Sequence, residues 1–374
     1  MESGQVYAIV RDADRWLVAR RPARVLTASG PQIFDALHEI DAGGFWAGFV
    51  AYDAGRAIER IETKTVDDVG LPDLAFVRFD DVSPVADLPP LPRLDVALGD
   101  GASSISPVEH EVLVERIHEL LVAGECYQVN LTRRVMYPVA PDPLALFGAI
   151  ARTNPAPHAM VCTFGAVRPD LAIVSASPEC FLRVDGRAVE TRPVKGTARD
   201  GSTLVASAKD RAENVMIVDL ARNDLGRVCE FGSVHVPALF EVEHRPGLAH
   251  LVSTVRGRLR PDVDLAALVR ATFPPASVTG APKPRVLQAI EDLEPVRRGV
   301  YCGAVGWIDG DRRRAELAVA IRTFTIAAGN TYLGLGGGIV ADSCARAEWA
   351  ETELKGARLL GAVGARAEER AEVR

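Results

Sequence analysis

Short apolar segments separated by Gly and Asp turns fill the first 82 residues, as in GGFWAGFVAYDAG at 43–55. This spacing predicts short strands. A different repeat follows at 108–125, where Leu113, Ile117 and Leu121 recur at the spacing of one helix face. The chain therefore begins with strands and continues with an amphipathic helix.

Further strands are predicted after this helix, and they come in runs. The segments are CYQVNLTRRVMYP (126–138), HAMVCTFG (158–165), LAIVSASPECFLRV (171–184) and RAVETRPVKG (187–196). Two more helices are expected at 207–224 and 343–360. Because strands and helices come in blocks rather than in strict βαβ alternation, we expect an α+β fold with antiparallel sheets.

The domain organisation follows from composition along the chain. Residues 1–82 form an N-terminal region that contributes strands, and 83–107 are rich in Pro, Gly and Ser, which is typical of a connector. Residues 108–362 form the main domain. The charged tail at 363–374 is expected to be a frayed helix end.

Composition narrows the class of protein. The chain has 374 residues, 48% of them hydrophobic, and a net charge of −7, so nucleic acid and anionic membranes are poor partners. No segment reaches the roughly 20 apolar residues of a membrane span, and the N-terminus lacks an export signal. The six cysteines are scattered without a CxxC motif, which indicates reduced thiols and a cytoplasmic enzyme.

One lysine stands in an unusual setting. Lys195 stands two residues after Pro193 and directly before Gly196 in ETRPVKGTARD (190–200), which predicts a rigid turn. A free lysine has a pKa of about 10.4, so only about one in 10³ is neutral at pH 7. Full deprotonation would cost about 4–5 kcal/mol unless burial or a nearby cation lowers the pKa.

Two predicted helices carry pairs of carboxylates. Asp210 and Glu213 lie three residues apart, as do Glu348 and Glu351, so each pair shares a helix face. Structural explanations exist: Ser207 and Asp210 fit a capping box, and Glu351 with Lys355 fits a surface ion pair. If the four acids instead converge, they would bind a hard cation such as Mg²⁺, because the set offers only oxygen ligands.

From about residue 107 to 362 the chain resembles the chorismate-binding enzymes. The matching segments are CYQVNLTRR, SASPECFL, RPVKGTARD, KDRAENVMIVDLARNDLGRV, HLVSTVRG, TGAPK, YCGAVGW, AIRTFTI and GGGIVADSCARAEWAETELK, in this order. GFVAYDAGR (48–56) extends the likeness into the N-terminal region. The resemblance implies two large packed antiparallel β-sheets with helices on the outside.

Within that family, Lys195 indicates the branch. Anthranilate synthases resemble the chain but carry alanine there, whereas aminodeoxychorismate, isochorismate and salicylate synthases carry lysine. QVNLT (128–132) and DLARNDLGR (219–227) resemble the ammonia-using enzymes. The expected activity is that of an aminodeoxychorismate synthase component I, a transferase that converts chorismate and ammonia to 4-amino-4-deoxychorismate for p-aminobenzoate and folate synthesis.

The resemblance also implies roles for individual residues. Lys195 would be the nucleophile and Glu179 the general acid. Glu213 and Glu351 would bind Mg²⁺ directly, and Asp210 and Glu348 through water; Mg²⁺ would also offset the repulsion between these acids and dianionic chorismate. Substrate contacts are expected from Thr279, Tyr301, Arg322, Gly336, Gly338, Lys355 and His250.

The chain lacks the nucleophile elbow of a glutaminase, so ammonia would come from ammonium salts or from a separate glutamine amidotransferase subunit. Three alternatives to the aminodeoxychorismate synthase stay open. One is a lysine-bearing isochorismate or salicylate synthase that uses water, and another is an anthranilate synthase component I. The third is a non-catalytic regulator that binds chorismate or tryptophan, which the presence of Lys195, Glu179 and both acid pairs disfavours.

Overall fold

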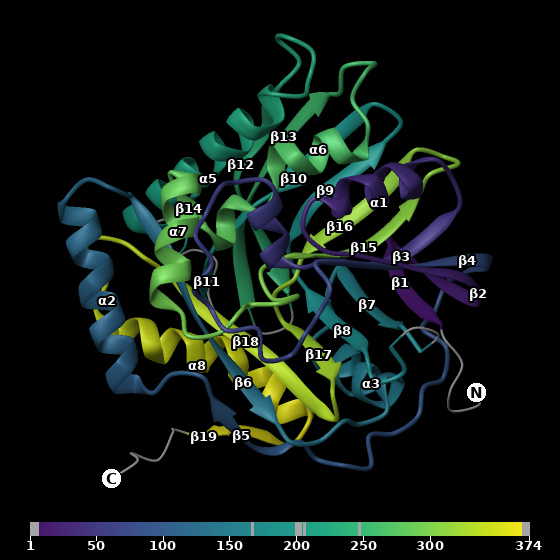
Figure 1. The fold of residues 1–374 in the computed structure, drawn as a ribbon, viewed down its shortest axis with the longest axis horizontal. Coiled ribbons are helices and arrows are strands. Elements are labelled where there is room, and N and C mark those ends of the chain that lie inside the picture. Colours follow the sequence, from purple (N-terminus) through teal and green to yellow (C-terminus); the bar gives the residue numbers. More distant parts are fainter. Residues whose placement is uncertain (1–6, 166–167, 199–203, 205–206, 246–247, 369–374) are drawn as a thin grey trace.

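The computed structural model describes the chain except residues 1–6, 166–167, 199–203, 205–206, 246–247 and 369–374 (Figure 1). Side chains at 197–198, 208–210, 245, 248 and 367–368 also lie outside the described part. Within the described residues, nineteen strands join one network of hydrogen-bonded pairs. None of the described helices is both long and apolar enough to cross a membrane.

The network consists of two halves joined by the hairpin of β1 and β2. In the first half, β14, β6, β18, β17, β8, β7 and β1 follow one another as antiparallel neighbours, and β5 also pairs with β6. These strands are β1 (Ala8–Asp12), β5 (Gly99–Ser103), β6 (Gln128–Tyr137), β7 (His158–Thr163), β8 (Ala172–Ser177), β14 (Gly280–Ala281), β17 (Thr323–Ala327) and β18 (Asn330–Ile339).

In the second half, the antiparallel order is β2, β4, β3, β15, β16, β9, β10, β13 and β12, with β11 on the same edge of β13 as β10. These strands are β2 (Arg15–Ala28), β3 (Phe45–Val50), β4 (Leu74–Val85), β9 (Cys180–Asp185), β10 (Ala188–Arg192), β11 (Val194–Ala198), β12 (His235–Arg245), β13 (Leu248–Arg258), β15 (Ala304–Asp309) and β16 (Arg314–Val319).

The two halves pack against each other through buried side chains. One apolar cluster contains Met160 and Ile173 from the first half together with Phe49 and Val305 from the second. Phe49 also packs edge-on against Phe164, with ring centroids 5.5 Å apart. Because strands from both halves bury one face in the same core, the expected packing of two antiparallel sheets is confirmed.

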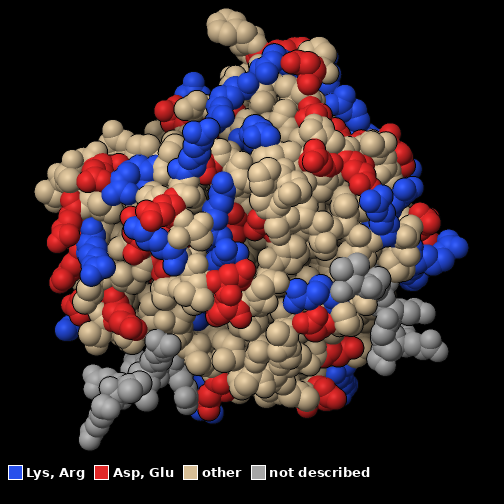
Figure 2. Space-filling view, viewed as in Figure 1, with Lys and Arg blue, Asp and Glu red and all other residues tan. Residues whose placement is uncertain are grey.

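The helices cover the outside of this core (Figure 1). They are α1 (Gln32–Asp41), α2 (Pro107–Val122), α3 (Pro143–Thr153), α5 (Ala208–Gly226), α6 (Leu265–Thr272), α7 (Lys283–Leu293) and α8 (Ala345–Ala362), with short 3₁₀ turns η1 (Tyr52–Ala57) and η2 (Ala276–Val278). α5 packs on β13 and β11, α8 on β18, and α7 on β6. Acidic and basic side chains intermix over the face in Figure 2.

Local chemistry explains where α2 begins. The Ser106 side chain accepts from the backbone N–H of Glu109, the Glu109 carboxylate accepts from the N–H of Ser106, and Pro107 occupies the first turn. This capping box satisfies two N–H groups that have no partner inside the helix. The helix predicted at 108–125 is therefore confirmed, with an end three residues earlier.

Two predicted strands are each interrupted at a proline. The segment 171–184 forms β8 and β9 with a break at Pro178, and 187–196 forms β10 and β11 with a break at Pro193. Proline lacks the N–H that would continue the ladder. The first break places Glu179, and the second separates β10 from the strand that carries Lys195.

Two sequence-based expectations were wrong. Lys195 lies in strand β11 rather than in a turn, because its segment pairs with β13. The tail is not a helix end at 365–368: these residues form β19 (Ala365–Glu368), which pairs in parallel with β5. The run Gly336–Gly338, which carries two predicted substrate contacts, lies in strand β18 and pairs with β6. The domain boundaries predicted at 82, 107 and 362 stay predictions.

Candidate active site

Lys195 projects from an irregular point in β11. It pairs with Leu251 of β13, and the register shifts between Lys195 and Thr197, where Gly196 adopts a positive φ of 81°. Such a bulge turns a side chain away from the regular pleat. The Lys195 side chain is only 13% exposed, and its Nζ lies 3.8 Å from Oε2 of Glu213 on α5.

Burial lowers the pKa of Lys195, because the charged ammonium loses its hydration. The next effect is the nearby carboxylate of Glu213, which opposes this change by favouring the ammonium. Lys355 lowers the pKa further by charge repulsion, and Glu179 and Glu351 oppose it more weakly. The net direction is toward a neutral amine, as a nucleophilic lysine requires.

Glu179 occupies the break between β8 and β9 and is almost fully buried. Desolvation raises its pKa from 4.5 to about 7, although hydrogen bonds from the Ser277 side chain and the Val194 backbone favour the carboxylate. Lys195 lowers the pKa of Glu179 in turn, so the two groups interact. A carboxylic acid that keeps its proton near neutral pH can act as a general acid.

Gln128, at the start of β6, completes this group. Its side chain is fully buried, and neither amide atom has a hydrogen-bond partner within the described part of the chain. A Cβ atom at Gly338 of β18 would lie 2.7 Å from Nε2 of Gln128 and 3.1 Å from Nζ of Lys195. The glycine therefore leaves the space in which the amide and the amine lie, and the unpartnered amide faces this space.

The predicted acidic residues lie around the lysines. Glu351 on α8 forms an ion pair with Lys355 at 2.6 Å, as its i,i+4 spacing indicated. Glu348 is buried, and its Oε1 accepts from the Ser343 hydroxyl at 2.7 Å. A Cβ atom at Gly337 would lie 3.3 Å from Oε2 of Glu348 and 3.8 Å from Nζ of Lys355, so both side chains face the same strand.

The donors near Lys195 are carboxylate oxygens, and this chemistry fits a hard divalent cation. Among the described side chains, no three from His, Cys, Asp or Glu lie close enough together to hold a metal ion. The side chain of Asp210 lies outside the described residues. The ligand set of Asp210, Glu213, Glu348 and Glu351 therefore stays a prediction.

The predicted substrate contacts lie on several elements. Thr279 is fully buried after η2, and its hydroxyl donates to the Pro275 carbonyl at 2.9 Å. The Tyr301 ring fills the space over Gly334, where a Cβ atom would lie 2.1 Å from the ring. Burial raises the pKa of Tyr301 well above its usual value, so its hydroxyl stays a hydrogen-bond donor.

Arg322 has a backbone φ of 51°, a left-handed conformation that is uncommon for arginine and is often found at functional sites. Burial and the charge of Arg358 lower its pKa. Within the described residues, no carboxylate forms an ion pair with Arg322, so the guanidinium is available to an anionic ligand.

Two remaining candidates have contacts within the sheets. The carbonyl of Gly336 accepts from Nζ of Lys355 at 3.1 Å. His250 of β13 is buried and lies opposite Thr197 of β11 and Glu243 of β12. The structure thus brings Lys195, Gln128 and Gly338 directly together, with Glu179 and Glu213 beside them.

A separate hollow lies away from this group. A groove of about 510 Å³ between β2, β4 and the β15–β16 turn is lined by both arginines and aspartates, including Arg15, Arg78, Asp80 and Arg312. It contains none of the residues predicted for the site. The group around Lys195 is chemically the stronger candidate, because it combines buried ionisable groups with displaced pKa values.

Comparison with known proteins decides the family. The family model described as chorismate binding enzyme matches residues 86–361. The chain belongs to this family. The family resemblance noted in the sequence is therefore confirmed, and the site around Lys195 is the candidate active site of a chorismate-binding enzyme.

Relatives within the family differ in their reactions. Aminodeoxychorismate synthase component 1 of Klebsiella aerogenes is 38% identical over 84% of this chain and 76% of its own length. Anthranilate synthase component 1 of Arthrobacter globiformis is 35% identical over 88% of this chain and 72% of its own. Two enzymes with different names thus match this chain at similar identity within the one family.

Solved structures agree with the fold. Anthranilate synthase component I from Streptococcus pneumoniae superposes with a TM-score of 0.81 at 29% identity, covering 93% of this chain and 92% of that one. An isochorismate synthase from Bacillus anthracis gives 0.80 at 20% identity over 97% of both chains. The second likeness concerns the fold alone.

Gln128 was missed as a site residue in the sequence, where it appeared only within the block QVNLT. The sequence does show a polar side chain among the apolar positions of a predicted strand, which is unusual. Its place beside Lys195 depends on β18, whose residues lie more than 200 positions later in the chain.

Proposed function

We propose that this chorismate-binding enzyme is an aminodeoxychorismate synthase component I, which converts chorismate and ammonia to 4-amino-4-deoxychorismate. The most direct support is the pairing of a buried Lys195, whose pKa is lowered, with a buried Glu179, whose pKa is raised to about 7. Relatives of this name from Klebsiella aerogenes and Escherichia coli are 38% and 36% identical to the chain.

The proposed reaction has two displacements. Nζ of Lys195 forms a bond to C2 of the ring while the C4–O bond breaks, and Glu179 protonates the leaving hydroxyl, which departs as water. Ammonia then forms a bond to C4 as the bond between Lys195 and C2 breaks, and the excess proton returns to the carboxylate of Glu179. The balance is chorismate plus ammonia to 4-amino-4-deoxychorismate plus water.

Gln128 favours ammonia over water as the second nucleophile. Water needs a general base to become an effective nucleophile, whereas neutral ammonia already carries a reactive lone pair. The side chain beside Lys195 is an amide, which does not accept a proton near neutral pH. Its unpartnered oxygen and N–H groups can instead hydrogen-bond ammonia or the substrate.

We include Mg²⁺ in the proposal, held by Glu213 and Glu351 directly and by Asp210 and Glu348 through water. Bound there, it would bind the ring carboxylate of chorismate and offset its repulsion by the acids. Arg322 and Tyr301 would bind the second carboxylate, with Thr279, His250, Lys355 and the backbone near Gly336 and Gly338 completing the pocket.

The ammonia would come from a separate glutamine amidotransferase subunit. Five of the six cysteines are buried, and the exposed Cys344 stands in DSCAR, without the flanking glycines of a nucleophile elbow. The words "component 1" in the names of the relatives also imply a second component.

The test is to incubate the purified chain with chorismate, Mg²⁺ and ¹⁵N-ammonium, and to identify the product by mass. We expect a ¹⁵N-containing product that retains the enolpyruvyl group, with no release of pyruvate. A product of unchanged mass formed without ammonium would identify an isochorismate synthase, and pyruvate release with amination would identify an anthranilate synthase. Either result would overturn the proposal.

Chelation tests the metal in the same assay. With EDTA we expect product formation to fall at least about tenfold and to recover on addition of Mg²⁺, since ligand positioning and charge neutralisation are lost. Equal rates with EDTA and with Mg²⁺ would contradict the metal assignment without affecting that of Lys195.

A further inference from the structure

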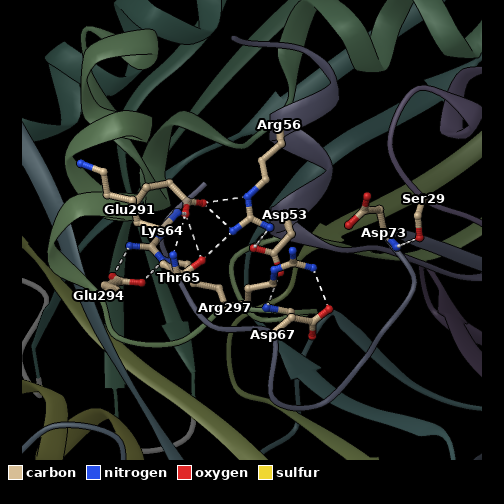
Figure 3. Close-up of polar contacts among 12 residues, drawn as sticks. Ser29, Asp53, Arg56, Lys64, Thr65, Asp67, Asp73, Glu291, Glu294 and Arg297 are labelled. Atoms are coloured by element: carbon tan, nitrogen blue, oxygen red, sulfur yellow. Dashed lines mark hydrogen bonds and ion pairs between the residues drawn. The ribbon is translucent and has the colours of Figure 1, made fainter. Parts of the chain in front are cut away.

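A buried ion pair binds the backbone next to two candidate site residues, Thr279 and Gln128. Arg298 and Glu294 are both about 5% exposed or less, and Nη2 of Arg298 donates to Oε1 of Glu294 at 2.6 Å, with Nε to Oε2 at 2.9 Å. Neither residue has a role in the reaction proposed above. Glu294 directly follows α7, and Figure 3 shows it beside Glu291 in a network of polar contacts.

Arg298 also binds two backbone carbonyls near the active site. Nη1 donates to the carbonyl of Val278 at 3.0 Å, and Nη2 donates to the carbonyl of Asn130 at 2.6 Å. Val278 directly precedes Thr279, and Asn130 lies two residues after Gln128 in β6. One guanidinium therefore connects the turn that carries Thr279 to the strand that carries Gln128.

Glu294 also binds strand β6, through the same oxygen that accepts from Arg298. Its Oε1 accepts from both the backbone N–H and the hydroxyl of Thr132, each at 2.9 Å. The N–H of Asn130 in turn donates to the carbonyl of Thr279 at 2.9 Å. The pair thus fixes Asn130 and Thr132 of β6 and the Thr279 turn relative to each other.

The N-terminal segment AYDAGR is part of this arrangement. The Arg298 guanidinium stacks 4.4 Å from the centroid of the Tyr52 ring. The backbone N–H of Tyr52 donates to the carbonyl of Gly299, and the N–H of Gly299 donates to Asp53. The segment that extended the family likeness into the N-terminal region therefore holds Arg298 in place.

A neighbouring pair provides a control. Glu291 lies on α7, three residues before Glu294, is also buried, and accepts from Nε of Arg56 at 2.8 Å (Figure 3). Its other oxygen accepts from Lys64 and Thr65, so it ties α7 to the loop after η1. Glu291 and Glu294 are both buried at the C-terminal end of α7, one inside the helix and one directly after it. Of the two, Glu294 is the one whose hydrogen bonds reach a strand of the active site.

We propose that Glu294 and Arg298 are positioning residues, which set the place of Thr279 and of the Gln128 strand for chorismate binding. A buried ion pair is weak evidence for stability, because desolvation offsets most of the attraction. The hydrogen bonds that the pair makes to the Thr279 turn and to β6 indicate instead that it positions these two segments. The proposal rests on the active site described above and not on whether ammonia or water is the nucleophile.

The test compares Glu294→Gln and Arg298→Lys with Glu291→Gln. Chorismate affinity is measured by titration calorimetry with each change made in a Lys195→Ala background, where turnover does not interfere. kcat and KM are measured with each change made in the enzyme that retains Lys195. All assays are run well below the melting temperature of each variant. We expect the first two variants to weaken chorismate binding about tenfold and to raise KM, and Glu291→Gln to lower the melting temperature with KM within twofold of the original.

If Glu294→Gln fails to fold, the apolar double variant Glu294→Leu with Arg298→Met removes both buried charges and keeps the volume. We expect it to fold and to bind chorismate at least tenfold more weakly. Unchanged affinity in the folded Glu294 or Arg298 variants, or an equal loss in Glu291→Gln, would overturn the positional role. A different reaction product would overturn the proposed function but leave these affinity results in force.

Discussion

Two lysines of this protein are equally buried yet differ in their surroundings. Lys195 and Lys283 each leave 13% of the side chain exposed. Nζ of Lys283 donates to Asp224 at 2.9 Å and to the carbonyl of Thr272 at 3.0 Å. Within the described residues, the carboxylate oxygen paired with Lys195 lies at 3.8 Å, beyond hydrogen-bond distance.

The comparison shows that burial alone does not produce a nucleophile. At Lys283 two acceptors replace the lost water, so the ammonium is satisfied and serves the structure. At Lys195 the described part of the chain offers no such pair of close acceptors, and a second cation, Lys355, adds repulsion. The amine is therefore the form that this site favours, in the place where the substrate is expected.

The largest expected effect is that of Lys195→Ala. We expect the rate of product formation to fall on the order of 10³-fold, with residual activity from direct attack by ammonia. The variant should fold normally, since among the described residues the carboxylate paired with this amine lies 3.8 Å away. Steady-state kinetics with chorismate and ammonium checks this, and activity within tenfold of the original would contradict the nucleophile assignment.

Glu179→Gln is expected to lower kcat by about 10²–10³-fold, because the leaving hydroxyl loses its proton donor. The pH profile sharpens the assignment. The acid form of Glu179 is lost as the pH rises through about 7, so the rate should fall on that side, and the glutamine variant should lack this limb. If the glutamine variant keeps the same fall in rate at alkaline pH, a group other than Glu179 is responsible for that fall.

The same displaced pKa affects stability. The folded-state pKa of Glu179 is raised from 4.5 to about 7, so the folded protein holds this proton more tightly than the unfolded chain. Its contribution to stability is present below pH 4.5 and is lost as the pH rises to about 7. In Glu179→Gln, the free energy of unfolding should lose this pH dependence, which denaturant titration at several pH values measures.

Gln128→Leu is expected to raise the KM for ammonium about tenfold, because the amide no longer hydrogen-bonds the incoming nucleophile. It should also raise the free energy of unfolding by about 1 kcal/mol, because an unpartnered buried amide is replaced by an apolar group of similar size. Kinetics and denaturant titration together test this. A loss of stability would show that Gln128 is satisfied in the free enzyme.

Lys283→Met should have the smallest effect on activity, with kcat and KM within about threefold of the original. It should instead destabilise the protein by about 3 kcal/mol, since Asp224 is left partly buried without its cation. Thermal unfolding and kinetics measure both. A loss of activity comparable to that of Lys195→Ala would remove the distinction between the two lysines.

Much of the fold could be predicted from the sequence, because hydrophobic periodicity is a local signal. The helices at α2, α5 and α8 and the blocks of strands follow from it. The tail was assigned wrongly because its charges match a frayed helix. Residues 365–368 pair instead with β5, which lies more than 250 positions earlier, and local pattern does not contain such a pairing.

The candidate site was predicted in part. Lys195 and Glu179 were identified by resemblance, and the structure adds their burial and the directions of their pKa values. Gln128 and the pair Glu294–Arg298 were not identified. Their roles depend on contacts between strands, turns and helices that are distant in sequence, such as the bonds from Arg298 to Asn130 and Val278.

The decisive measurement is the mass of the enzyme after brief incubation with chorismate and Mg²⁺ in the absence of ammonium, followed by acid quench and peptide mapping. A neutral, accessible Lys195 predicts a covalent adduct of chorismate minus water on the peptide that contains this residue, and none on the Lys283 peptide. An enzyme that forms product on later addition of ammonium but carries no adduct on Lys195 would contradict the account.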